Sequence, residues 1–123
     1  MTRSEFQAEL GGILLLLRDH AFLAYSPSGR REYEQKLATC ADYFAYLVFR
    51  KTGVPVRALP GLVSIESVRE ASYSAGRSLA VRAGKRARAL AAKATGLDRQ
   101  YYAECAAVWE RAAAKLAEPD REL

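Results

Sequence analysis

The amino-acid sequence predicts an all-α protein, a four-helix bundle in which one helix, over about residues 64–95, is long and basic. Alanine is abundant, only 4 of the 123 residues are proline, and half of the residues are hydrophobic. Apolar residues recur at intervals of three and four, and the alternation typical of strands is almost absent. Because a chain of this length can bury one core without disulfides or metals, we expect residues 1–123 to form a single helical domain.

The first helix is expected over about residues 4–25. Ser4 can cap its N-terminus, and Gln7, three residues later, would complete a capping box. The main apolar stripe begins at Phe6, while further leucines fall on the opposite side, which is typical of a helix that is central to its fold or covered by another chain. The apolar run 10–17 is too short to cross a bilayer, and acidic residues precede it where a signal peptide needs positive charge. We therefore expect a cytoplasmic protein.

The second helix is expected over about residues 30–51, after a turn at Ser26–Gly29. Acidic residues in its first turns and basic residues in its last turn complement the helix dipole, and Gly53 can cap its C-terminus. The connection over residues 53–63 contains two prolines and is apolar. We expect it to pack over one end of the bundle.

The third helix is expected to start near Ser64 and to continue to about Thr95, with Gly96 as its stop signal. One of its faces consists mostly of alanine and glycine, so another helix can approach it closely. The sequence leaves open whether the helix is continuous through Gly76 and Gly84.

The fourth helix is expected to begin after Asp98, a candidate N-cap, and to end before Pro119. Trp109 lies beside its apolar stripe and is expected to anchor the core. Cys105 falls on this stripe and Cys40 on that of the second helix, too far apart in sequence for a metal motif. We expect both cysteines to be buried free thiols.

The surplus positive charge is confined to the predicted third helix. Residues 71–97 hold six basic residues and no acid, while the other 13 of the 19 basic residues stand against 14 acidic ones. The formal net charge of +5 is therefore a local property. A field of one sign attracts polyanions, of which nucleic-acid phosphates are the commonest. The predicted nucleic-acid-binding residues are Arg77, Arg82, Lys85, Arg86, Arg88 and Lys93.

Two other interpretations of this basic face are an ordinary solvated surface and a contact with an acidic protein. Glu104, Glu110 and Glu118 of the fourth helix could neutralise some of its charge across the bundle. Solvated faces usually mix both signs, however, and the planar fork of arginine suits phosphate. We therefore expect polyanion binding, with the choice between DNA and RNA left open.

Apolar residues outside the expected core predict a second surface, for a protein partner or a homo-oligomer. Its possible interface residues are Leu15, Leu16, Leu23, Tyr46 and Phe49. Tyr43 and these two aromatic residues of the second helix also stand near Arg50 and Lys51, and such interleaving can stack bases. Because the helix carries aromatics on more than one face, we expect instead that these rings lie in the core or in a subunit contact.

No sequence motif points to catalysis, a metal or a cofactor. His20 is the single histidine, without a matched acid or cysteine, and no residue has the context of a nucleophile or a general base. The pair Gly11-Gly12 lacks the strand and the lysine of a phosphate-binding loop. The small apolar residues of the third helix include no Trp or Phe to insert into a membrane. We expect a non-enzymatic protein without cofactor, metal or membrane partner.

These observations predict a small helical subunit that binds nucleic-acid backbone without sequence preference, through its basic helix. One helix face of six cations gives modest affinity, so we expect the subunit to act within a larger nucleoprotein complex. In size, helicity and charge it is similar to accessory subunits that line a guide or target strand in RNA-guided effectors. The alternative is a protein–protein interaction module, namely an adaptor, an inhibitor or an obligate oligomer, that uses the apolar faces of the first two helices.

Overall fold

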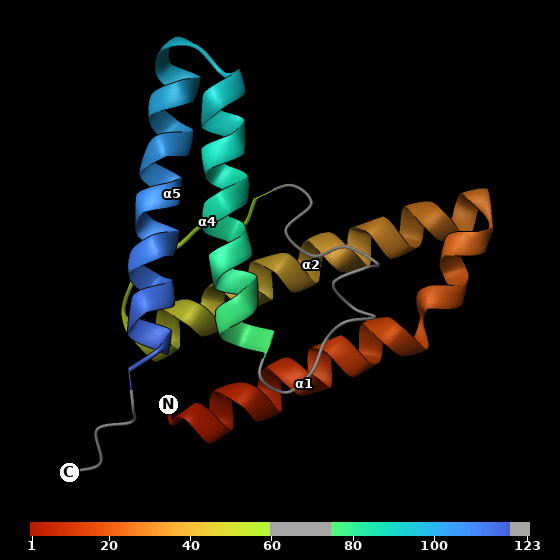
Figure 1. Ribbon diagram of the computed structural model, residues 1–123. Helices are drawn as coiled ribbons and strands as arrows, with labels where there is room; N and C mark the ends of the chain where they lie inside the picture. Colours follow the sequence, from red (N-terminus) through yellow and green to blue (C-terminus); the bar gives the residue numbers. More distant parts are fainter. Residues whose placement is uncertain (60–74, 119–123) are drawn as a thin grey trace.

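The computed structural model describes residues 1–59 and 75–118, and within these ranges the regular structure is entirely helical. The elements are α1 (Arg3–Asp19), the short 3₁₀ helix η1 (Ala21–Tyr25), α2 (Pro27–Thr52), α4 (Ala75–Lys93) and α5 (Gly96–Leu116). Figure 1 shows α1 and α2 side by side, with the α4–α5 hairpin crossing them near the end of α2. The predicted all-α class is confirmed, and the packing of the four α-helices is consistent with a four-helix bundle.

The first helix begins and ends differently from the prediction. The N-cap is Thr2, whose hydroxyl accepts a hydrogen bond from the Glu5 amide at 3.1 Å, so the predicted Ser4 cap is wrong. The helix ends at Asp19, and residues 21–25 form η1 instead of continuing it. The amide of His20 is shared between the carbonyl oxygens of Leu16 and Leu17, at 3.3 and 3.2 Å. This tightened last turn starts the change to 3₁₀ geometry.

The second helix starts three residues earlier than expected, at Pro27. Ser26 caps it by accepting a hydrogen bond from the Gly29 amide at 3.1 Å, and proline is favoured at the first helical position. The helix ends at Thr52, and Gly53 follows with φ 76°, as the predicted C-cap requires.

Residues 53–59, hereafter the strap, have no regular secondary structure and cross α5 (Figure 1). Val54 and Leu59 of the strap are buried in the core. The indole nitrogen of Trp109 donates a hydrogen bond to the Arg57 carbonyl at 2.9 Å. The Trp109 ring is fully buried and stacks on Phe44 with a centroid distance of 5.9 Å. These contacts confirm that Trp109 anchors the core and that residues 53–59 of the connection pack on the bundle, while its residues 60–63 lie outside the described residues.

The α4–α5 hairpin is joined through small side chains. Within Ala75–Lys93 the helix continues through Gly76 and Gly84, whereas the predicted start near Ser64 lies outside the described residues. A Cβ at Gly76 would collide with the ring of Phe6, so glycine allows α4 to approach α1 there. The fully buried alanines of the hairpin are Ala80, Ala83, Ala87, Ala106 and Ala112.

The fourth predicted helix also begins earlier than expected. Thr95 is the N-cap of α5 and Asp98 lies in its first turn, so the predicted Asp98 cap is wrong. Gly96, the expected stop signal, is the first residue of α5 and has φ 60°. Both cysteines are free thiols: Cys105 is buried, and Cys40 is only half-buried. Burial nevertheless raises the pKa of the Cys40 thiol, with a smaller opposing effect of Lys36. No helix of the described residues is long and apolar enough to cross a membrane.

Candidate nucleic-acid interface

All six predicted binding residues on α4 are exposed. At about 100° per residue they fall into two rows. The groove row, beside α5, contains Arg77, Lys85 and Arg88, and the flank row, on the other side of the exposed arc, contains Arg82, Arg86 and Lys93. The first and last residues of each row are eleven positions apart along the helix, or about 16 Å. The described part of α4 carries no acidic residue, so the two rows form a continuous cationic surface.

The groove row borders a depression of about 620 Å³ between α4 and α5. Its apolar lining consists of Val81 from α4 and two alanines, Ala113 and Ala114, from α5. Because its lining residues come from both α4 and α5, the depression lies between the two helices. Glu110 of α5 is the acidic residue in its lining.

Glu110 neutralises one member of the groove row. The guanidinium of Arg88 donates two hydrogen bonds to its carboxylate, Nε to Oε1 at 2.7 Å and Nη2 to Oε2 at 2.8 Å. These hydrogen bonds lower the pKa of Glu110 and raise the pKa of Arg88. Both side chains remain about half exposed, so solvent reaches the pair. The predicted neutralisation across the bundle thus occurs at Glu110, whereas Glu104 lies on another side of α5, beside the strap.

Arg77, Lys85 and Lys93 make no ion pair or hydrogen bond through their side chains with any other residue in 1–59 or 75–118. Their charges are therefore exposed to solvent and to ligands. An exposed cation without a nearby acid attracts phosphate more strongly than one held in an ion pair. These three residues, from both rows, are the part of the surface best able to bind a polyanion.

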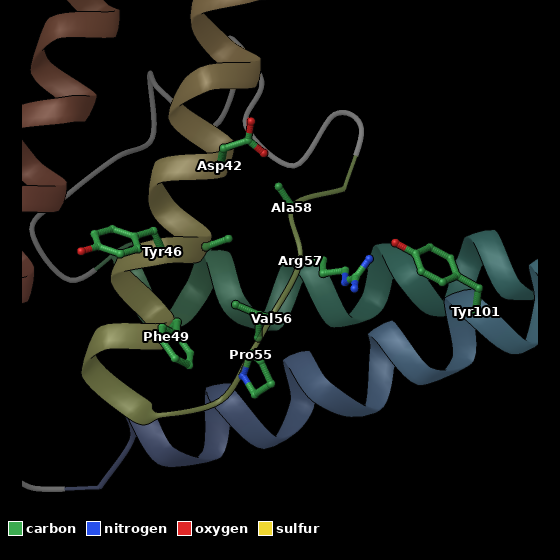
Figure 2. Close-up of a pocket in the computed structure, with 9 residues that line it drawn as sticks. Asp42, Tyr46, Phe49, Pro55, Val56, Arg57, Ala58 and Tyr101 are labelled. Carbon is green, nitrogen blue, oxygen red and sulfur yellow. The ribbon is translucent and has the colours of Figure 1, made fainter.

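A second depression, of about 670 Å³, lies between α2, the strap and α5 (Figure 2). Its lining residues are Asp42, Ala45, Tyr46, Phe49, Pro55, Val56, Arg57, Ala58 and Tyr101. We call it the aromatic groove. Sequence reasoning missed Arg57 and Tyr101 as site residues, because they reach it only through the crossing of the strap over α5.

Three aromatic residues near the end of α2 lie outside the core, whereas Tyr33 and Phe44 of the same helix are buried in it. Tyr43, Tyr46 and Phe49 are 40%, 51% and 47% exposed, so of the two expected places the core is wrong, and a subunit contact stays a prediction. The Arg50 guanidinium lies 5.9 Å from the centroid of the Tyr46 ring, within the range of a cation–π contact. The Tyr43 hydroxyl donates a hydrogen bond to Glu9 at 3.1 Å, which raises the pKa of Tyr43.

The five possible interface residues do not form one surface. Leu15 and Leu16 are exposed on α1, next to η1, whereas Tyr46 and Phe49 line the aromatic groove near the end of α2. Leu23 lies in η1 and is half-buried against the core, so it offers less surface than the sequence predicts. The apolar surface is therefore divided into two separate patches.

The described residues contain no cluster of three or more His, Cys, Asp or Glu residues that could hold a metal ion. His20, the single histidine, ends α1, and its Nδ1 lies 2.8 Å from the Leu16 carbonyl oxygen. Comparison with known proteins gives no relative: no protein-family model, no curated protein and no solved structure matches this chain.

Proposed function

We propose that the protein is a non-enzymatic helical subunit that binds nucleic-acid backbone through α4. The observation that carries this proposal is the exposed arc of α4, on which six cations and no acid face solvent. Such a surface attracts any polyanion, and its regular spacing along a helix suits a linear one. Each row of about 16 Å matches the rise of about five phosphates along one strand of a duplex.

Binding through α4 is independent of base sequence. Besides the six cations, the exposed face of α4 presents only Ser78, Val81 and alanines, and it has no Asn or Gln to pair with a base edge. Contacts with phosphate fix position without reading sequence. A single face with few cations gives modest affinity, so the subunit works within a larger nucleoprotein assembly. An RNA-guided effector, in which a subunit lines a guide or target strand, is an assembly of this kind.

The test compares two variants that lose the same charge. The first is Arg77→Gln/Lys85→Gln/Lys93→Gln, and the control, Arg18→Gln/Arg31→Gln/Arg111→Gln, changes exposed cations of the other helices. Both are titrated with single-stranded and duplex DNA and RNA at 50–200 mM salt. We expect the log–log salt dependence of wild-type affinity to fall with a slope of about −2 to −5, for three to six phosphates. The first variant should lose about 2 units of this slope and the control should keep it.

Two outcomes would overturn the proposal. One is the absence of wild-type binding at 50 mM salt. The other is an equal loss of affinity in both variants, which would show that net charge matters and the position of the cations does not. The ranking of the four nucleic acids then decides which strand the subunit binds.

A protein-interaction module is the second candidate, and the exposed leucines of α1 favour it. Leu15 and Leu16 are 42% and 57% exposed on the side of α1 opposite the core. Apolar neighbours left in solvent mark interfaces. Sedimentation at high protein concentration, with Leu15→Ser/Leu16→Ser as the comparison, tests the oligomeric form. A wild-type protein that stays monomeric counts against it.

A further inference from the structure

The aromatic groove has an apolar part formed by the end of α2 and the strap. The Phe49 ring is half exposed, and Figure 2 shows it beside Pro55 and Val56 of the strap. An exposed ring beside proline and valine side chains forgoes the burial that stabilises most phenylalanines. Base stacking uses a π-face presented to solvent in this way, and it tolerates any base.

The opposite part of the groove is suited to an anion. Figure 2 shows the Arg57 side chain pointing toward the hydroxyl of Tyr101. Although Asp42 lines the same groove and Glu104 the adjoining one, the Arg57 side chain makes no ion pair or hydrogen bond with a described residue. A guanidinium and a phenol hydroxyl are both hydrogen-bond donors to phosphate.

Asp42 distinguishes the two ends of the groove. Its exposed carboxylate lies on α2, and Figure 2 places it away from Tyr101, near Ala58. A carboxylate repels phosphate but accepts hydrogen bonds from the exocyclic amino group of cytosine. Adenine and guanine carry such amino groups as well, whereas uracil and thymine do not.

The groove is held in place by the core beneath it. The strap is fixed by the hydrogen bond from buried Trp109 to the Arg57 carbonyl, and by buried Val54 and Leu59 on either side. The backbone of the strap therefore needs little ordering when a ligand binds. The groove volume of about 670 Å³ falls within the range of small-ligand sites.

From these observations we infer that the aromatic groove binds one nucleotide of a single strand, with the base on Phe49 and the phosphate on Arg57 and the Tyr101 hydroxyl. Asp42 accepts a hydrogen bond from the base, so bases with an amino group are preferred. This inference rests on the proposed function and extends it, because a paired base in a duplex cannot enter the groove. The partner it names is a single strand.

The experiment measures affinity for oligocytidylate, oligouridylate and a duplex of equal length. Phe49→Ala removes the stacking ring, and Phe22→Ala, an exposed ring on η1, is the matched control. Asp42→Asn tests the preference for an amino group, and circular dichroism checks that each variant folds. A 5-iodocytosine substituted in the first oligomer crosslinks to the side chain on which the base stacks, and peptide mapping locates it.

We expect Phe49→Ala to weaken oligocytidylate binding by about 5- to 150-fold, the effect of losing one base–aromatic stack. Phe49→Ala should not change the affinity for the duplex or the log–log salt slope. Phe22→Ala should bind oligocytidylate like wild type, and the 5-iodocytosine crosslink should lie at Phe49. Asp42→Asn should reduce the preference for cytosine over uracil.

The failures of the two proposals are distinguishable. Equal single-strand affinities of Phe49→Ala and wild type overturn this inference, and they leave the groove to a segment of a partner protein. If the α4 variant, Arg77→Gln/Lys85→Gln/Lys93→Gln, then still loses nucleic-acid binding, the proposed function stands. Single-strand binding that survives the α4 variant but is lost in Phe49→Ala supports the groove and overturns the assignment to α4. No wild-type binding overturns both.

Discussion

Replacing Glu110 by glutamine should strengthen nucleic-acid binding. The carboxylate of Glu110 holds both nitrogens of the Arg88 fork at 2.7 and 2.8 Å, and a phosphate would occupy the same two donors. In the wild-type protein a phosphate must therefore displace a carboxylate before Arg88 can contribute. Glu110→Gln keeps the shape of the side chain and removes its charge, so the guanidinium becomes available.

The expected gain is one phosphate contact. The log–log salt slope should steepen by about 0.7 for a single strand and about 0.9 for a duplex. At 0.1 M salt this corresponds to about five- to eightfold tighter binding. Because both partners are about half exposed to solvent, the thermal midpoint of unfolding should change little.

Fluorescence anisotropy at 50–300 mM salt measures both quantities. Glu34→Gln, an exposed acid on α2, removes the same charge and is the control. Glu34→Gln should show a smaller gain in affinity than Glu110→Gln and an unchanged log–log salt slope. The reasoning is refuted if both variants gain equally, or if Glu110→Gln still steepens the slope in an Arg88→Gln background, where no fork remains to be released.

Three further predictions concern stability, measured by urea or thermal unfolding. Because the pKa of Glu110 is lowered in the folded protein, its ion pair stabilises the fold above the unfolded pKa near 4.5. This stabilisation is lost as the pH falls through the folded pKa. Glu110→Gln should therefore make the free energy of unfolding depend less on pH in this acidic range. Trp109→Phe removes a buried donor to the strap and should lower the free energy of unfolding by about 2–4 kcal/mol. Gly12→Ala, with nothing near its added methyl, should raise it by about 0.5–1 kcal/mol, whereas Gly76→Ala should lower it by about 1–3 kcal/mol because of the Phe6 ring.

The helices were predictable because each has a stripe of apolar residues at helical spacing, but several of their boundaries were not, and the end of α1 shows why. The stripe of the first helix continues past Leu17 to Ala21 and Ala24, while the helix ends at Asp19. A 3₁₀ helix repeats every three residues, so it can extend an apolar stripe that an α-helix began. The apolar pattern therefore cannot distinguish a continuing α-helix from a change to a 3₁₀ helix. The change is visible only in the folded backbone, where the amide of His20 is shared between two carbonyl oxygens.

The basic surface of α4 was predictable from a local fact, the absence of acid over residues 71–97. The pairing of Arg88 was not, because Glu110 lies 22 residues away and meets it only through the register of α4 on α5. The same limit applies to the aromatic groove. Phe49 and Tyr101 line one groove because Trp109 fixes the strap across α5, and nothing local in either helix indicates that they share it.

The position of α5 relates the two sites to each other. Glu110 faces α4 and Tyr101 faces the strap, and residues nine apart on an α-helix point in directions about 180° apart. The α4 surface and the aromatic groove therefore lie on opposite sides of α5, and a single strand that occupies both must pass around the hairpin. Oligomers too short to pass around the hairpin can then occupy only one site, while longer strands gain affinity from the second site by linkage. A stepwise rise of affinity with length, lost in Phe49→Ala, indicates one bridging strand, and equal affinity at all lengths excludes it.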